Sequence, residues 1–208
     1  FSERLLSRFG RVRPFLSVEG RQMVLRRAAF RRHAELTVFS RVSQTSGFAE
    51  TMDELIGRFK QSCITPDDLA AAVAAMDPDS LLAKKLHDIL VIYRESEAFL
   101  NERYLTAQDL LTEALCVLKD ADLSETYVYV DDLDRTREQV LRLLETIISR
   151  AKSVTMTLRA EPDPRLSALF ETEEERAQRL SFYCAERGIP VFTKTFTDSS
   201  AKVDPAIE

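Results

Sequence analysis

The stretch TYVYVDDLDRTREQ, residues 126–139, carries the clearest signals for the fold of the second half of the chain. Its residues 127–130 form a short, continuous apolar run, as in a parallel strand that is buried on both faces. Two adjacent carboxylates, Asp131 and Asp132, follow directly, and Thr136 with the glutamine three residues later forms the capping box of a helix. The stretch therefore predicts a strand, a turn and a helix start, and it raises the question of what the two acids do.

The chain after residue 125 alternates strands and helices. A second strand is expected over residues 153–158, where apolar and polar residues alternate. A further helix is expected to open at the capping box of Thr172 and Glu175 and to end at Gly188, and a last strand to cover residues 190–196. This order is typical of an α/β unit with a parallel sheet, and α/β is the fold class that we predict.

The chain before this point is predicted to be helical almost throughout, because its apolar residues recur with the helical period of about 3.6 residues. The expected helices begin after Ser17 (to about Arg32), at Gly47, after Thr65, at Pro78 (to about Arg103) and after Thr106 with Asp109. We expect the apolar stripes of these helices to form a core, and we assign them no function.

Three parts of the chain are therefore predicted. Residues 1–124 form an all-helical subdomain, residues 125–196 a βαβαβ segment, and residues 197–208 a loose tail. No internal repeat and no low-complexity segment is seen in any of them.

Composition narrows the class of protein. The 208 residues are 45% hydrophobic and 30% charged, as in ordinary globular proteins, and no run of about 18 apolar residues predicts a membrane span. The N-terminus lacks the apolar segment of a signal peptide, and because the chain begins at Phe1 rather than Met we expect an excised fragment. The three cysteines have no paired spacing, which favours a reducing, cytoplasmic compartment, and the two histidines have no zinc-site spacing.

Positive charge is concentrated at the start of the chain. The net charge is −5, yet residues 1–33 carry nine arginines against two glutamates, a local net charge of +7 (nine minus two). Such a cluster is a candidate contact for phosphates. The alternative is a solvated helix face whose arginines pair with acidic helices later in the chain.

The two acids after the predicted strand allow two interpretations. Ligands of open α/β sheets bind beyond the carboxyl ends of the strands, where one carboxylate can hold Mg²⁺ and a second can orient a water, as in the Walker B motif of nucleotide-driven motors. Hydrolysis also requires a phosphate-binding loop, GxxxxGK[ST], and the five glycines of the chain are too far apart to form one. The acids are therefore half a nucleotide site at most. The alternative is that Asp131, Asp132 and Asp134 are turn and cap residues.

Four stretches of the chain resemble a known family in their order and spacing. They are FSERLLSRFG with RPFLSVEGRQMVLRRA (residues 1–10 and 13–28), GFAETMDELIGRFKQSCITPDDL (47–69), LHDILVIYRESEAFLNERYLTAQDLL (86–111) and VYVDDLDRTREQVLRLLETIISRAKSVTMTL (128–158). Together they resemble the N-terminal, helicase-like region of the B subunit of the bacterial AddAB-type ATP-dependent helicase–exonucleases, the AddB family. The second stretch is the most specific, and no matched motif is catalytic.

The resemblance implies a fold, a process and a partner. The helical part would be a 1B-like subdomain inserted into a superfamily 1 helicase core, and the α/β part would be a piece of its RecA-like core. Members of this family form a heterodimer with a motor–nuclease subunit, which takes part in the resection of double-strand breaks for recombinational DNA repair. The longer parent would bind ATP, Mg²⁺ and a 4Fe-4S cluster outside this chain, so that Cys63, Cys116 and Cys184 would not be cluster ligands.

The resemblance also places Asp131 and Asp132 where a working helicase has its Walker B acids. Asp132 stands where a motor has Glu, and a side chain shorter by one methylene holds the attacking water poorly, so we expect no ATP hydrolysis. Asp131 is the candidate Mg²⁺ ligand. No catalytic residue and no cofactor-binding residue is expected within this chain.

In the light of this family, some arginines near the N-terminus become candidate contacts for the backbone of single-stranded DNA: Arg13, Arg21, Arg26 and Arg27. Phe15 and Phe30 could stack on bases, although we expect both to pack in the core.

Three functions remain open at this point. The first is a DNA-processing component that is non-catalytic in isolation. The second is an interaction scaffold that docks on a partner subunit without touching DNA. The third is a free-standing Mg²⁺-dependent enzyme or phosphoacceptor domain built on Asp131 and Asp132.

Overall fold

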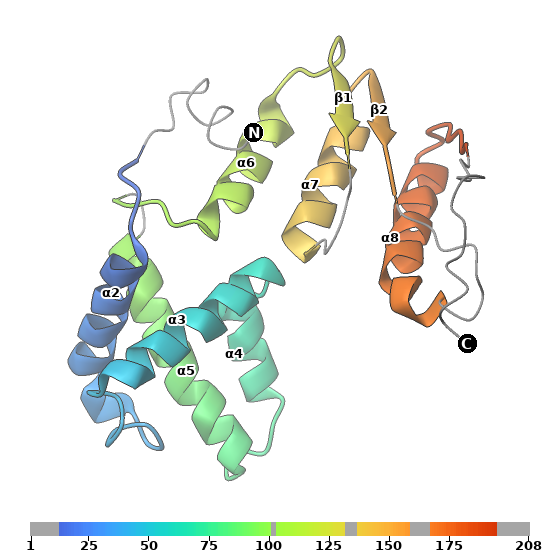
Figure 1. Cartoon of the computed structure of the whole chain (residues 1–208). Coiled ribbons are helices and arrows are strands. Elements are labelled where there is room, and N and C mark those ends of the chain that lie inside the picture. The colour runs from blue at the N-terminus through green and yellow to red at the C-terminus, as the bar shows by residue number, and fades with distance from the viewer. Residues whose placement is uncertain (1–12, 101–102, 132–136, 159–166, 195–208) are drawn as a thin grey trace, which may run out of the picture.

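The described residues fold into a group of four helices followed by an α/β unit. The computed structural model describes residues 13–100, 103–131, 137–158 and 167–194. Figure 1 shows helices α2 to α5 packed together at one end of the molecule, and α6, α7 and α8 in a row beneath the strands β1 and β2.

Three of the four helices of the first group, α2, α3 and α4, follow the start signals read from the sequence. The four are α2 (Val18–Arg31), α3 (Ser46–Gln61), α4 (Pro66–Ala74) and α5 (Leu81–Leu100), with a short 3-10 helix, η1, at His33–Glu35. Ser17 caps α2 by accepting a hydrogen bond from the N–H of Gly20 (3.2 Å). Thr65 and Asp68 form the capping box of α4. Both predicted N-caps are confirmed.

Helix α5 begins later than predicted. It begins at Leu81 rather than Pro78 and runs to Leu100, and residues 101 and 102 lie outside the described ranges. The hydroxyl of Ser80 accepts a hydrogen bond from the N–H of Ala83 (3.2 Å). The backbone N–H of Ser80 donates to the carbonyl of Asp77 (3.1 Å). Ser80 therefore caps the helix after a turn, which moves its start past the proline.

One carboxylate lies inside the helical group. Asp88 of α5 is fully buried and accepts hydrogen bonds from the backbone N–H groups of Thr37, Val38 and Phe39 at 2.8–3.1 Å. These N–H groups follow η1 and lie outside any helix, so the side chain of Asp88 supplies the acceptors that the backbone would otherwise lack. Asp88 thereby ties the segment after η1 to α5, while apolar residues of α2 to α5 form the surrounding core.

The α/β unit contains the parallel pair that the sequence predicts. Its elements are α6 (Asp109–Asp120), β1 (Tyr127–Val130), α7 (Glu138–Ile148), β2 (Ser153–Met156) and α8 (Ser167–Glu186). The strands are parallel, with Tyr127 opposite Ser153 and Val130 opposite Met156. The fold class α/β is confirmed at this level: a mostly helical chain with a small parallel sheet.

One core of the unit joins α6 to α7, and another joins α7 to α8. The first contains Ala114, Leu118, Leu143 and Ile147 with Val128 and Val154 of the strands. The second contains Leu144, Ile148, Leu180 and Cys184 with Val130 and Met156. Helix α6 thus packs on α7, whereas the division of the chain at residue 124 stays a prediction.

Strand β1 is not buried on both faces, and that part of the prediction is wrong. Val128 and Val130 pack inward, whereas Tyr127 is 57% exposed and Tyr129 is 76% exposed. All helices that cover the sheet within the described residues lie on its inner face, so the outer face has no cover there.

The end of the α/β unit also differs from the prediction. Helix α8 begins at Ser167, five residues before Thr172, so Thr172 lies inside the helix and the predicted capping box does not start it. Gly188 has a φ of +65°, the left-handed conformation expected of a residue that ends a helix. The last strand is absent from residues 190–194, and residues 195 and 196 lie outside the described ranges.

The two ends of the helical group lie side by side. Leu105 donates its N–H to the carbonyl of Pro14, and Leu16 donates its N–H to the carbonyl of Leu105, both at 2.9 Å. Phe15 and Leu105 thereby form an isolated parallel bridge. The chain therefore enters and leaves the group of helices at neighbouring points.

Among the described helices, not one combines the length and the apolar character that a membrane span requires.

Candidate functional site

The carboxyl ends of β1 and β2 bring Asp131 and Thr157 together. The hydroxyl of Thr157 donates a hydrogen bond to a carboxylate oxygen of Asp131 (2.6 Å), and its N–H donates to the carbonyl of Val130 (3.0 Å). Asp131 is exposed to solvent. The structure thus places Asp131 at the sheet edge where α/β proteins bind ligands, with the hydroxyl of Thr157 beside it.

The described residues alone do not make a metal site. No three His, Cys, Asp or Glu side chains are grouped closely enough among them to hold a metal ion. Asp132 and Asp134 lie outside the described ranges, so the structure describes only Asp131 of the predicted acidic pair. Asp131 offers a single carboxylate that already accepts a hydrogen bond, which falls short of the several oxygen ligands that Mg²⁺ takes.

Sequence reasoning did not single out Thr157, although a signal for it was present. Residues that directly follow neighbouring parallel strands meet at the same edge of the sheet, and Thr157 follows β2 as Asp131 follows β1. The register of the two strands, Val130 opposite Met156, then sets the two side chains next to each other.

Most of the described arginines near the N-terminus are held by carboxylates. Arg13 pairs with Glu113 (2.6 Å) and Arg21 with Asp53 (2.8 Å), while Arg31 and Arg32 approach Glu95 and, for Arg32, Glu35 at 3.1–3.6 Å. For these four arginines the alternative interpretation is confirmed: they pair with acids later in the chain. The first three arginines, Arg4, Arg8 and Arg11, lie outside the described ranges.

Arg26 and Arg27 differ from the other four. Both are exposed, and within the described part of the chain neither forms an ion pair with a carboxylate. The guanidinium of Arg27 lies over the ring of Phe99, 4.5 Å from its centroid. A cation over an aromatic face keeps its charge and leaves its other side open to an anion.

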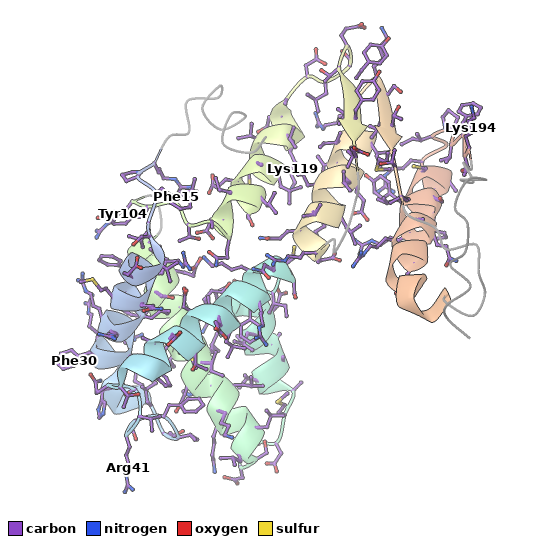
Figure 2. All side chains as sticks on the ribbon, viewed as in Figure 1. Phe15, Phe30, Arg41, Tyr104, Lys119 and Lys194 are labelled. Carbon is purple, nitrogen blue, oxygen red and sulfur yellow. The ribbon has the colours of Figure 1, made fainter. Side chains whose placement is uncertain are left out.

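These two arginines share a helix face with exposed apolar side chains. Met23 and Phe30 are each 70% exposed, and the positions 23, 26, 27 and 30 fall on one face of α2 because they are spaced by three and four residues. We call Met23, Arg26, Arg27 and Phe30 the α2 outer face. Figure 2 shows Phe30 pointing away from the helical group.

Phe15 is also exposed, at 55%, so neither Phe15 nor Phe30 packs in the core as predicted. The cause is the position of each residue in its segment. Phe15 belongs to the bridge that joins the ends of the helical group, and Phe30 lies on α2 opposite Val24, Leu25, Ala28 and Ala29, which are buried. The exposure of Met23 was not predicted from the sequence, although its position outside that buried stripe indicates an exposed side chain.

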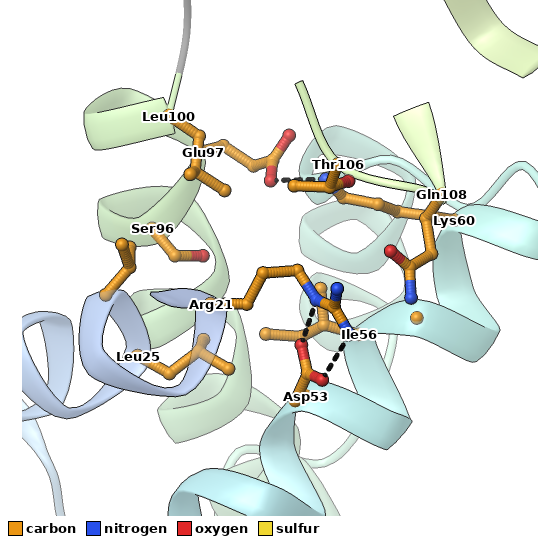
Figure 3. Close-up of a pocket in the computed structure, with 12 residues that line it drawn as sticks. Arg21, Leu25, Asp53, Ile56, Lys60, Ser96, Glu97, Leu100, Thr106 and Gln108 are labelled. Atoms are coloured by element: carbon orange, nitrogen blue, oxygen red, sulfur yellow. Dashed lines mark hydrogen bonds and ion pairs between the residues drawn. The ribbon is translucent and has the colours of Figure 1, made fainter. Parts of the chain in front are cut away.

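A polar cluster lies between the helices and the start of α6 (Figure 3). Arg21 faces Asp53 there, and the ammonium of Lys60 lies 2.8 Å from Glu97 and 2.7 Å from Asp109. The cavity between these side chains measures about 20 Å³, far below the several hundred that an organic ligand needs. The cluster therefore holds α3, α5 and α6 together, and the cavity at its centre is too small for an organic ligand.

Burial and pairing shift the protonation of this cluster. Burial alone would lower the pKa of the Lys60 ammonium, but Glu97 and Asp109 outweigh it, so that the pKa is raised. Burial raises the pKa of the Glu97 carboxyl, and Lys60 offsets only part of that effect. Lys60 thus carries its charge at neutral pH, and its charge favours the ionised form of Glu97 against the effect of burial.

The three cysteines lie on different elements. Cys63 follows α3 and is half-buried, Cys116 on α6 is exposed, and Cys184 on α8 is buried in the core with α7. Burial raises the pKa of the Cys184 thiol, which makes it less reactive. That none of them binds an iron–sulfur cluster in a longer protein stays a prediction.

Comparison with known proteins points to one family. The family model described as "ADDB, N-terminal" matches residues 1–207. The chain is similar to proteins named as the B subunit of an ATP-dependent helicase/deoxyribonuclease: that of Bacillus velezensis is 31% identical over 84% of this chain, that of Bacillus subtilis 28% over 89%, and that of Pelotomaculum thermopropionicum 34% over 78%. These matches span 15%, 17% and 14% of the relatives' own lengths.

Proposed function

The chain belongs to the ADDB N-terminal family, and on this premise we propose that it is the helicase-like region of the B subunit of a helicase–deoxyribonuclease, non-catalytic in isolation. It serves double-strand break resection and recombinational DNA repair in the cytoplasm. Its partners are single-stranded DNA and the motor–nuclease subunit of the heterodimer. The chain spans about one sixth of the curated relatives it matches, so the activity of the whole protein depends on polypeptide outside it.

The α2 outer face carries the DNA-binding part of this proposal. Arg26 and Arg27 present two cations that no described carboxylate neutralises, and exposed apolar side chains lie on either side of them. Single-stranded nucleic acid is bound by this combination: cations contact the phosphates, and flat or apolar side chains contact the bases. Phe30 is the side chain that we propose to meet a base.

Arg13 and Arg21 are weaker candidates for the same role. Each would have to leave a carboxylate before it could contact a phosphate, and the bidentate pair of Arg21 with Asp53 is largely buried. Breaking a charge-assisted pair of that kind costs about 2 kcal/mol. The proposal therefore depends on Arg26 and Arg27. We assign Arg13 and Arg21 a structural role, because their ion pairs with Glu113 and Asp53 join separate segments of the fold.

The helical group is proposed to be a 1B-like subdomain inserted into a RecA-like core. The bridge between Phe15 and Leu105 supports this, because an inserted subdomain must begin and end at neighbouring points of its host. The parallel pair β1–β2 with α7 as its crossover is the repeating unit of such a core.

Asp131 is proposed to mark the metal-binding strand end of the parent rather than to bind Mg²⁺ by itself. Supporting this are its place after β1 and the lack of a ligand set among the described residues. ATP, Mg²⁺ and a 4Fe-4S cluster would be bound, if the parent uses them, by groups outside this chain. A free-standing Mg²⁺ enzyme built on Asp131 and Asp132 has less support.

An interaction scaffold without DNA contact is the second candidate. The exposed apolar side chains of α2 favour it, because such side chains also occur at protein interfaces. In that case the α2 outer face would contact the motor–nuclease subunit, and its two arginines would lie at the polar rim of the interface.

Fluorescence anisotropy separates the two candidates. A labelled single-stranded oligonucleotide is titrated with the chain at several salt concentrations. The DNA-binding proposal expects an affinity that falls with salt, with a slope of log K against log salt of about −0.7 for each phosphate contacted. No salt-sensitive binding, together with binding to the motor–nuclease subunit that is lost in Phe30→Glu, would favour the scaffold.

A further inference from the structure

The segment after α5 places a third arginine next to the α2 outer face. The guanidinium of Arg103 lies 5.5 Å from the centroid of the Phe99 ring, and that of Arg27 lies 4.5 Å from the same centroid. Both distances are within the range of a cation–π contact. One ring of α5 therefore holds an arginine from each of two segments of the chain, and we call Arg27, Phe99 and Arg103 the Phe99 stack.

The Phe99 stack concentrates positive charge at the surface. The guanidinium carbons of Arg27 and Arg103 are at most 10 Å apart (4.5 plus 5.5), because both lie near one centroid. Both arginines are exposed, and within the described part of the chain no carboxylate pairs with either. Two cations at this distance repel each other, and a phosphate bound beside them would offset that repulsion.

The ring at the centre of the stack is fixed by its own packing. Phe99 is half-buried and stacks on Tyr104, with 6.4 Å between the ring centroids and 20° between the ring planes. A guanidinium that already lies on such a ring loses less conformational freedom on binding a phosphate than one that moves in solvent. This packing gives Phe99 the features of a positioning residue for two phosphate contacts.

The contacts between α2 and α5 show in which direction this surface runs. Arg27 lies over Phe99, and one turn further along α2 Arg31 approaches Glu95 (3.3 Å), so the two helices are antiparallel. Arg103 therefore lies towards the start of α2. Figure 2 shows Tyr104 and Phe15 near the start of this helix and Phe30 near its other end.

The α2 outer face and the Phe99 stack together extend along the whole of α2. We propose that a single strand of DNA follows this path, with phosphates at Arg26 and in the Phe99 stack and a base at each end, on Phe30 and on the exposed Phe15. The 14 residues of α2 measure about 21 Å. At about 3.4 Å per nucleotide, the spacing along one strand of B-DNA, this length takes about six nucleotides. The inference rests on the DNA-binding function proposed above and extends it.

Arg103→Ala tests the extended path by anisotropy titration of residues 1–208 with a labelled single strand of about ten nucleotides. The loss of one phosphate contact should lower the affinity several-fold and make the slope of log K against log salt less negative by about 0.7. Arg103→Lys keeps the charge and should keep the slope. Arg94→Ala is the matched control and should change neither quantity, because Arg94 is an exposed arginine of α5 that pairs with Asp67.

The ring and the far end of the path are tested separately. Phe99→Leu should lower the affinity, whereas Phe99→Tyr, which keeps a ring under both guanidiniums, should retain it. In a series of oligonucleotide lengths, the affinity of the unsubstituted chain should rise up to about six nucleotides and then level off. Phe15→Ala should weaken binding of the longer strands, and Phe182→Ala, at an exposed phenylalanine of α8, should not.

The outcomes separate this inference from the DNA-binding function on which it rests. No salt-sensitive binding by the unsubstituted chain would overturn both. Binding that is lost in the double variant of Arg26 and Arg27 but keeps its affinity and salt slope in Arg103→Ala would overturn the extended path alone. An affinity that stops rising at about three nucleotides would do the same, since the α2 outer face alone then holds the strand. Equal losses in Phe99→Leu and Phe99→Tyr would contradict the positioning role of the ring.

Discussion

Arg21 and Asp53 join α2 to α3 through two parallel hydrogen bonds, both 2.8 Å long. The guanidinium Nε and one Nη donate to the two carboxylate oxygens, and both side chains are largely buried. This is the strong, bidentate form of the arginine–carboxylate pair. It makes Arg21 part of the packing of the helical group, whereas Arg26, five residues later, points to solvent.

Arg21→Ala is therefore expected to reduce the free energy of unfolding by about 2 kcal/mol, since it leaves Asp53 partly buried without its partner. Urea unfolding followed by circular dichroism measures the loss. Arg58→Ala is the matched control, because Arg58 lies on α3 and is mostly exposed. Equal unfolding free energies for the two variants would show that the Arg21–Asp53 pair contributes no more than a surface arginine does.

Asp88→Ala should destabilise the protein most among single substitutions of charged residues. It would leave the partly buried backbone N–H groups of Thr37, Val38 and Phe39 without their acceptor, at an expected cost of about 3–5 kcal/mol. Hydrogen exchange should show that residues 37–39 lose protection first. Asp79→Ala, at an exposed position of the preceding turn, is the control and should cost less than about 0.5 kcal/mol. A small loss in Asp88→Ala would mean that the turn finds other acceptors.

Lys60→Met tests the polar cluster through its pH dependence. Removing the ammonium leaves Glu97 and Asp109 facing each other, and we expect a loss of about 2 kcal/mol at pH 7. The pKa of Glu97 is already raised by burial and should rise further without Lys60. Protonation of a group whose pKa is raised in the folded state stabilises that state, so the variant should recover part of the loss as the pH falls from 7 towards about 4.5.

Chemical denaturation at pH 7, 6 and 5 measures this recovery. Lys84→Met provides the comparison, since Lys84 pairs with the exposed Asp79 at the surface. If the stability of Lys60→Met ran parallel to that of the unsubstituted protein over this range, the coupling between Lys60 and Glu97 would be absent.

The contact between α7 and α8 should weaken in acid. Hydrogen bonds from Arg179, together with those from Arg142, lower the pKa of Glu138 from 4.5 to about 2. A carboxyl whose pKa is depressed on folding contributes stability above its unfolded pKa and loses it as the pH falls through the folded value, here between about 5 and 2. Glu138→Gln should therefore cost about 1 kcal/mol at pH 7 and show a flatter decline in acid.

Melting curves between pH 7 and pH 2.5 check the prediction for Glu138. Glu125→Gln removes a largely exposed partner of Lys152 and should leave the acid profile unchanged. An identical acid profile for Glu138→Gln and the unsubstituted protein would assign the acid sensitivity to other carboxylates.

Local signals in the sequence predicted the elements well, because caps and strand runs act over a few residues. Ser17, Thr65 and the strand of residues 127–130 are examples, and Thr157 could have been found from the same parallel pairing. The predicted start of α5 at Pro78 was wrong, because the hydroxyl of Ser80, two residues later, accepts a hydrogen bond from the N–H of Ala83 and caps the helix there.

Contacts between distant residues could not be predicted in this way. The choice between free and paired arginines depends on which acids lie opposite, and the partner of Arg13 is 100 residues away at Glu113 (113 minus 13). The exposure of Tyr129 depends on which elements pack against each face of the sheet, and no local sequence pattern specifies them. For the same reason the sequence could not separate Arg26 and Arg27 from Arg21.

The double variant Arg26→Ala with Arg27→Ala tests whether the α2 outer face binds single-stranded DNA. Anisotropy titrations with an unstructured single-stranded oligonucleotide should show a loss of affinity for every sequence tried, and the slope of log K against log salt should become less negative by about 1.4, or about 0.7 for each lost phosphate contact. Arg58→Ala should change neither quantity. An unchanged affinity and salt slope in a double variant that keeps its melting temperature would contradict the claim.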